Sequence, residues 1–103
     1  MEKSLIMIFL LLCSINMSVA QANSWCLLRA NVPKETAQGF INYACGILDC
    51  TPIFPGASCY YPNTTASHAS FALSLNYRRF GSCNPNIALV TVTDPSYGSC
   101  RYP

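Results

Sequence analysis

Six cysteines between residues 26 and 100 are the feature that most constrains how this chain of 103 residues can fold. They are Cys26, Cys45, Cys50, Cys59, Cys83 and Cys100, and a seventh, Cys13, lies in an apolar N-terminal segment. An even number of cysteines in a short secreted chain is typical of a disulfide framework. Zinc binding is the competing interpretation, but no Cys-x-x-Cys pair exists and His68 is the only histidine, so we expect no metal and no cofactor. Six cysteines allow fifteen pairings, and their spacing alone does not choose among them.

The first 22 residues have the layout of a secretory signal peptide. A short charged start at 1–3 precedes an apolar run over 5–13, which is too short to span a bilayer. Ala20 and Ala22 have the spacing of a cleavage site, so we predict cleavage after Ala22, with Ala20 as the close alternative. A retained membrane anchor is the weaker alternative. We therefore expect a secreted protein whose single domain covers residues 23–103.

The remaining 81 residues suffice for one domain with a small core. Three disulfides, at roughly 2–4 kcal/mol each, would add substantially to the stability of such a core. Charged residues are few, and the predicted mature chain has a net charge of +2 from Arg29, Lys34, Arg78, Arg79 and Arg101 against Glu35, Asp49 and Asp94. Because no basic cluster is denser than Arg78–Arg79, we expect no nucleic-acid partner, and we expect a monomer.

Hydrophobic periodicity predicts two helices. The first lies between residues 33 and 48, where apolar residues recur on one face and Pro33 suits the first helical position. The second begins at Asn63 or Thr64, either of which can cap it, runs to about residue 80 and stops at Gly81. Its apolar residues cover two adjoining sides, so we expect this helix to pack on more than one side.

The residues outside the helices indicate one strand and irregular loops. Residues 87–93 (IALVTVT) predict a strand, and we expect it to pair with residues 25–29 and with the C-terminal stretch. Residues 51–63 contain three prolines and predict an ordered loop held by Cys59. Together these elements predict a small α+β, disulfide-rich domain.

Groups suited to catalysis are scarce. Glycoside hydrolysis usually needs two carboxyl groups that face one bond. Glu35, Asp49 and Asp94 lie in separate segments, each with an ordinary structural role. His68 has no nucleophile motif beside it and is expected to be a packed or capping helix residue. We predict that the chain is not an enzyme.

Tyrosines placed beside cysteines are the candidate binding residues. Tyr60 and Tyr61 directly follow Cys59, and consecutive residues in an extended loop point opposite ways, so at least one of them should face solvent. Rings with a polar edge suit a half-wet surface, where the C–H face of a sugar can lie on them. The alternative for any single ring is a core position. The candidate ligand-binding residues are Trp25, Tyr60, Tyr61, Tyr77 and Tyr97.

Several short motifs occur in order along the chain: WC at 25–26, YACG at 43–46, DC at 49–50, PNTTASHASFA at 62–72, GSC at 81–83 and TDPSYGSCRYP at 93–103. Together they resemble the X8 domain, also called carbohydrate-binding module family 43, over essentially all of residues 23–103. The resemblance implies two helices packed on a small antiparallel sheet. It also implies the pairings Cys26–Cys83, Cys45–Cys50 and Cys59–Cys100.

The resemblance also implies a function. In plants such domains occur at the end of β-1,3-glucanases and in small callose-binding proteins of plasmodesmata, and they bind β-1,3-glucan of the callose or laminarin type without hydrolysing it. The implied Cys59–Cys100 bridge would bring Tyr60, Tyr61 and Tyr97 together as a glycan platform. We therefore predict a noncatalytic module in the apoplast or cell wall, with plasmodesmata as one place of action. The alternative is a secreted interaction or defence peptide on the same scaffold without sugar binding. A lipid-transfer protein would carry an adjacent cysteine pair, which is absent.

The chain departs from the family pattern in places. Around Cys83 it has RRFGSCNPNIALV, with a shortened segment before this cysteine and no glycine-bearing DF stretch after it, and this change could alter affinity. No glycolipid-anchor signal follows the last motif, so we expect no stable membrane anchor. Asn63-Thr64-Thr65 is a glycosylation sequon, so Asn63 is a glycosylation candidate, although a glycan there would compete with capping by its side chain.

Overall fold

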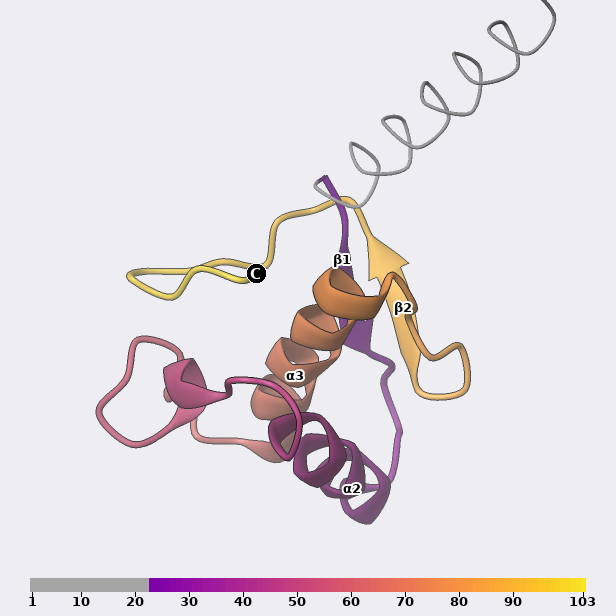
Figure 1. Ribbon diagram of the computed structural model, residues 1–103, viewed down its shortest axis with the longest axis horizontal. Coiled ribbons are helices and arrows are strands. Elements are labelled where there is room, and N and C mark those ends of the chain that lie inside the picture. Colours follow the sequence, from indigo (N-terminus) through magenta and orange to yellow (C-terminus); the bar gives the residue numbers. More distant parts are fainter. Residues whose placement is uncertain (1–22) are drawn as a thin grey trace, which may run out of the picture.

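The computed structural model describes residues 23–103, so the predicted signal peptide lies outside the described residues. Its elements, in chain order, are strand β1 (Trp25–Leu28), helix α2 (Lys34–Cys45), the short 3-10 helix η1 (Thr51–Ile53), helix α3 (Thr65–Phe80) and strand β2 (Ala88–Thr91). Helix α3 runs through the middle and packs against both α2 and β1 (Figure 1). This arrangement confirms the predicted α+β class, with two helices on a small antiparallel sheet. None of the helices within residues 23–103 has the length and apolar character needed to cross a membrane.

Helix α2 is shorter than the sequence predicted. Pro33 has φ −56° and ψ 142°, which is an extended conformation, so it precedes the helix and is not its first residue. The helix ends at Cys45, before the predicted end at residue 48, and the Cys45–Cys50 disulfide holds the chain in the turn that follows. Its buried residues are Ala37 and Ala44, whose small side chains permit close packing.

Helix α3 has the predicted ends. The Thr64 hydroxyl accepts a hydrogen bond from the Ser67 backbone N–H at 3.1 Å and so caps the N-terminus. Gly81 ends the helix with φ 76°, a left-handed conformation that glycine adopts without a steric penalty. Asn63, the other candidate cap, is exposed in the preceding loop. Of the two expected capping residues, the structure therefore uses Thr64.

Two buried clusters lie against different sides of α3. One cluster joins the helix to the sheet and consists of Cys26, Leu73, Tyr77, Ile87 and Ala88. The other joins the helix to the loops and consists of Cys50, Ile53, Cys59, Phe71 and Cys100. The helix is thus buried on more than one side, as its wide apolar stripe predicted. Cysteines occupy both clusters, so the disulfides form part of the core.

The three disulfides are those that the family resemblance implied. Cys26–Cys83, Cys45–Cys50 and Cys59–Cys100 have Cα–Cα distances of 5.7, 5.3 and 4.8 Å, all within the usual range. The third bridge joins residues that are 41 positions apart in sequence. It therefore fixes the loop before α3 to the C-terminal segment.

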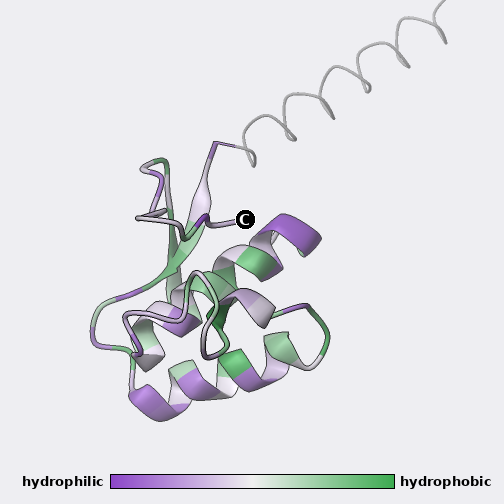
Figure 2. Cartoon of the chain, turned by 90° about the vertical axis from the view of Figure 1, so that its left-hand side faces the viewer, coloured by the Kyte–Doolittle hydropathy of each residue, from purple (hydrophilic) through white to green (hydrophobic). Residues whose placement is uncertain are grey.

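The sheet has two antiparallel strands among the described residues, with Trp25 opposite Thr91 and Leu28 opposite Ala88. Strand β2 is shorter than the predicted 87–93 because β1 offers only four residues for pairing. The prediction that the C-terminal stretch joins this sheet is wrong. That stretch forms only an isolated bridge between Tyr97 and Cys100. Both strands are predominantly hydrophobic (Figure 2).

Two serines of α3 form hydrogen bonds with the backbone groups of β1 on the edge that does not face β2. The Ser74 hydroxyl accepts a hydrogen bond from the Cys26 N–H at 3.2 Å and donates one to the Cys26 carbonyl at 2.7 Å. The Ser70 hydroxyl accepts from the Leu28 N–H at 3.1 Å. Alternate residues of a strand present their backbone groups to the same edge, and buried groups of this kind need partners. Side chains of α3 therefore form the backbone hydrogen bonds that a third strand would form in a larger sheet.

Candidate functional site

Tyr60 and Tyr61 lie in the loop between η1 and α3, directly after Cys59. Tyr61 is 73% exposed, whereas Tyr60 is half-buried. Their rings meet edge to face, with centroids 4.9 Å apart, so the expectation that they point opposite ways is wrong. The Tyr60 N–H bonds to the Ala57 carbonyl in a turn, and the alternation of an extended chain does not apply here. The result is a paired aromatic surface with one ring largely open to solvent.

Two side chains hold the backbone of this pair. The His68 Nε2 of α3 donates a hydrogen bond to the Tyr60 carbonyl at 2.8 Å, and the Tyr97 hydroxyl donates to the Tyr61 carbonyl. Because a carbonyl oxygen only accepts, the proton lies on Nε2 of His68. The His68 ring also packs 5.8 Å from the ring of Tyr60. His68 is therefore a packed residue, as predicted, and its hydrogen bond also positions the loop, which its sequence context did not reveal.

The Cys59–Cys100 disulfide explains why Tyr97 reaches this loop. Tyr97 and Cys100 form a tight backbone bridge with N–O distances of 3.0 and 2.8 Å, and Cys100 is bonded to the residue that precedes Tyr60. Tyr97 remains 39% exposed. The structure thus brings Tyr60, Tyr61 and Tyr97 together, and we call these three residues the tyrosine surface.

Tyr102 anchors the C-terminal segment behind the tyrosine surface. Its ring packs edge to face on Phe71 of α3 at 5.4 Å, and its N–H donates to the Ser96 hydroxyl at 2.9 Å. Burial, with a smaller contribution from nearby Tyr97, raises the pKa of Tyr102 to about 12. The raised pKa shows that this site disfavours the charged phenolate, which suits the packing of the ring against an apolar neighbour.

The other two candidate residues lie on different elements. Tyr77 of α3 is only 9% exposed, and its hydroxyl forms a hydrogen bond of 2.7 Å with the Ser24 hydroxyl. Its ring belongs to the core, so we do not include it in the tyrosine surface. Trp25 is half-buried on β1 opposite Thr91. Neither residue belongs to the loop that carries Tyr60 and Tyr61.

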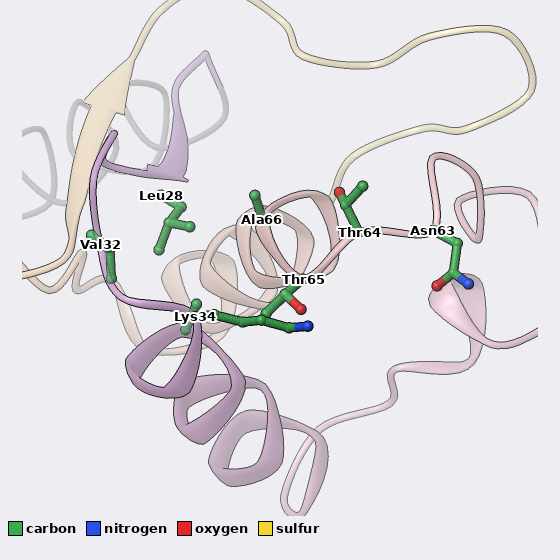
Figure 3. Close-up of a pocket in the computed structure, with 8 residues that line it drawn as sticks. Leu28, Val32, Lys34, Asn63, Thr64, Thr65 and Ala66 are labelled. Atoms are coloured by element: carbon green, nitrogen blue, oxygen red, sulfur yellow. The ribbon is translucent and has the colours of Figure 1, made fainter.

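An open cavity of about 450 Å³ lies where α2 and α3 begin (Figure 3). Its lining combines apolar residues with polar ones and comprises Leu28, Val32, Lys34, Ala37, Asn63, Thr64, Thr65 and Ala66. Leu28 and Val32 lie at one end, Asn63 lies at the other, and the Lys34 side chain extends toward Thr65 (Figure 3). The sequence does not reveal this cavity, because its residues come from three segments without a shared pattern.

The Asn63 end of the cavity adjoins the tyrosine surface. Only Pro62 separates Tyr61 from Asn63, and two residues span at most about 7 Å of chain. A lining that combines apolar residues with polar ones is common in sites for small ligands. The tyrosine surface and the cavity together form the candidate site.

The carboxylates of Asp49 and Asp94 have structural roles. The Asp49 carboxylate accepts hydrogen bonds from the hydroxyl and the N–H of Thr51, and Asp94 accepts from Ser96 N–H at 2.9 Å. These bonds, from Thr51 and from Ser96, hold the pKa of each carboxyl below its ordinary value. A general acid for glycoside hydrolysis needs its pKa raised. Within residues 23–103 there is no group of three or more side chains of the kinds that bind metal ions.

Comparison with known proteins connects this fold to a family. The X8 domain family model matches residues 24–86, which is more than half of the chain. The chain is 42% identical over 88 residues to a glucan endo-1,3-beta-D-glucosidase of Olea europaea, covering 80% of this chain and 19% of that protein. It is 35% identical over 86 residues to plasmodesmata callose-binding protein 2 of Arabidopsis thaliana, covering 78% of this chain and 44% of that protein. The chain thus spans about a fifth of the glucosidase and less than half of the callose-binding protein. On the family match and these identities, the chain belongs to the X8 domain family.

Proposed function

We propose that this protein is a noncatalytic, secreted module that binds β-1,3-glucan in the plant cell wall through the tyrosine surface. The observation that carries the proposal is the exposed ring of Tyr61, held on a loop that a disulfide and two hydrogen bonds fix in place. Membership of the X8 domain family supports it, as do relatives named for callose binding and for glucan endo-1,3-beta-glucosidase activity.

The chemistry of the surface suits a neutral polysaccharide. A pyranose ring can place its C–H face on Tyr61 while its hydroxyls bond to polar groups nearby, which for this chain include Asn63 and Thr64 in the lining of the cavity. Fixing the loop before binding lowers the entropy cost of association. The chain carries few charged residues, which suits an uncharged ligand.

The noncatalytic part of the proposal rests on the carboxyl groups. Asp49 and Asp94 have lowered pKa values and fixed structural partners, and Glu35 lies in the first turn of α2. The glucosidase relatives are about five times longer than the matched region, so their names describe proteins with much additional chain. We therefore assign binding, and no hydrolysis, to the part of the chain compared with them.

Secretion into the apoplast follows from the predicted signal peptide and agrees with the three disulfides, which persist in oxidising compartments. Location in the cell wall or at plasmodesmata is part of the same proposal, supported by the callose-binding relatives. We further propose that the protein acts as a monomer with polysaccharide as its partner, and that Asn63 is a glycosylation acceptor.

Native gel electrophoresis through laminarin, with cellulose and xylan as control polymers, tests the proposal. We expect retardation by laminarin alone, and loss of most of it in Tyr61→Ala. Tyr43→Ala is the matched control, because Tyr43 is another exposed tyrosine, 59% accessible, on the separate helix α2. Equal retardation of both variants would remove Tyr61 from the site. Absence of retardation with three intact disulfides would favour a secreted interaction or defence peptide.

A further inference from the structure

The loop that carries the tyrosine surface leads directly into the sequon Asn63-Thr64-Thr65. Asn63 is exposed, and the cap of α3 is made by the hydroxyl of Thr64, which accepts from Ser67 N–H at 3.1 Å. The Thr64 N–H is bonded to the Pro62 carbonyl at 2.8 Å. The helix cap therefore does not use the Asn63 side chain. A glycan on Asn63 would leave α3 capped, which removes the conflict that the sequence suggested.

Asn63 also occupies a particular place in the candidate site. It lies at one end of the cavity of about 450 Å³, opposite Leu28 and Val32 (Figure 3). Tyr61 is two residues away on the other side, within at most about 7 Å of chain. The first sugars attached to Asn63 would thus reach both the cavity mouth and the exposed Tyr61 ring.

We propose that Asn63 carries an N-linked glycan in the secreted protein and that this glycan controls access to the glucan-binding site. The inference rests on the proposed function, because it concerns the same site. The attached glycan acts as a tethered competitor, because its pyranose rings also present C–H faces and hydroxyl groups, as an external glucan does. Attachment at the rim keeps their local concentration high, and their bulk shields Tyr61. The unglycosylated form is open to glucan, and the glycosylated form is restricted.

The covalent step requires a lipid-pyrophosphate-linked oligosaccharide as co-reactant. The side-chain amide nitrogen of Asn63 forms a bond to the anomeric carbon of the first sugar. The bond from that carbon to the pyrophosphate oxygen breaks, and the electron pair leaves with the lipid pyrophosphate. The amide nitrogen loses one proton to the surrounding water, and no oxidation or reduction takes place.

Two preparations of the same sequence test this proposal. The full-length chain is expressed in a eukaryotic host that glycosylates secreted proteins, and residues 23–103 are produced without a glycan in a bacterial periplasm. Intact mass and a disulfide map identify each form, and Asn63→Gln from the eukaryotic host identifies the acceptor by its lower mass. We expect a glycan on Asn63 and laminarin binding at least roughly threefold weaker in the glycosylated form. Removing the glycan enzymatically should restore the binding.

The outcomes separate this inference from the proposed function. Absence of a glycan on Asn63 in the eukaryotic product would overturn the inference, as would equal laminarin affinity of the two forms. Failure of the unglycosylated, fully disulfide-bonded protein to bind laminarin would contradict the proposed function itself. In that case the mass measurement still decides whether Asn63 is modified. The proposed control of access would be contradicted together with the proposed function.

Discussion

At the scale of single residues, Tyr97 illustrates how a side chain can serve a binding surface without being its main contact. Its hydroxyl donates to the Tyr61 carbonyl, while its ring stays 39% exposed. A bridge to Cys100 fixes its backbone. The hydroxyl therefore positions the ring of Tyr61, and the ring of Tyr97 adds surface beside it. The family resemblance implied that Tyr97 lies beside Tyr60 and Tyr61, but no sequence pattern indicates this hydrogen bond.

Tyr97→Phe separates the two contributions, because it removes the hydrogen bond and keeps the ring. The bond is exposed, so we expect a loss of about 0.5–1.5 kcal/mol in laminarin binding, which corresponds to roughly a two- to tenfold weaker Kd. Isothermal titration calorimetry measures the change, and Tyr43→Phe on α2 controls for loss of a hydroxyl elsewhere. Unchanged binding by Tyr97→Phe, together with a loss in Tyr97→Ala, would show that only the ring matters.

Tyr102 makes the free energy of unfolding depend on pH in the alkaline range. Burial raises its pKa to about 12 in the folded protein, against about 10 in an unfolded chain. Because the folded state resists ionisation of this hydroxyl, its contribution is complete below pH 10 and is lost as the pH rises toward about 12. We expect the free energy of unfolding in urea to fall over this window, with a smaller fall in Tyr102→Phe. An identical pH dependence for both proteins would show that other groups cause it.

At the scale of elements, sequence periodicity predicted α3 well because its cap, its wide apolar stripe and its terminal glycine all indicate the same helix. The two-stranded sheet was harder to predict. The β-branched run of residues 87–93 does not reveal which groups form hydrogen bonds with the backbone of β1 on its edge away from β2. The answer lies in Ser70 and Ser74 of α3, whose hydroxyls bond to the backbone of β1. Serine at helical spacing carries no recognisable signal for this role.

Ser74→Ala tests the role of α3 in completing the sheet. Ser74 is fully buried and serves both the N–H and the carbonyl of Cys26, so its loss leaves two buried backbone groups without a partner. We expect the free energy of unfolding to fall by about 1–3 kcal/mol, measured in urea with the disulfides intact. Ser82→Ala, at an exposed position after α3, is the matched control. Similar stability of the two variants would mean that water or a backbone shift replaces the serine.

At the scale of the whole molecule, short motifs were enough to predict the family and, through it, the three disulfides. They did not reveal the cavity, because Leu28, Val32 and Asn63 come together only when β1 and the starts of α2 and α3 are packed. The Cys59–Cys100 bridge unites two loops that share no secondary structure. The tyrosine surface is therefore a product of the disulfide framework, and helix α3 supports it through His68 and Phe71.

The most direct test of the central claim is an NMR titration of ¹⁵N-labelled, disulfide-bonded protein with laminarihexaose. We predict that the largest changes in amide chemical shift belong to residues 59–66 and 96–101, which carry the tyrosine surface and the Asn63 end of the cavity. Cellohexaose at the same concentration should leave the chemical shifts of these amides unchanged. Shifts confined to β1, β2 or the exposed face of α2, or no shifts with laminarihexaose, would contradict the assignment of the site.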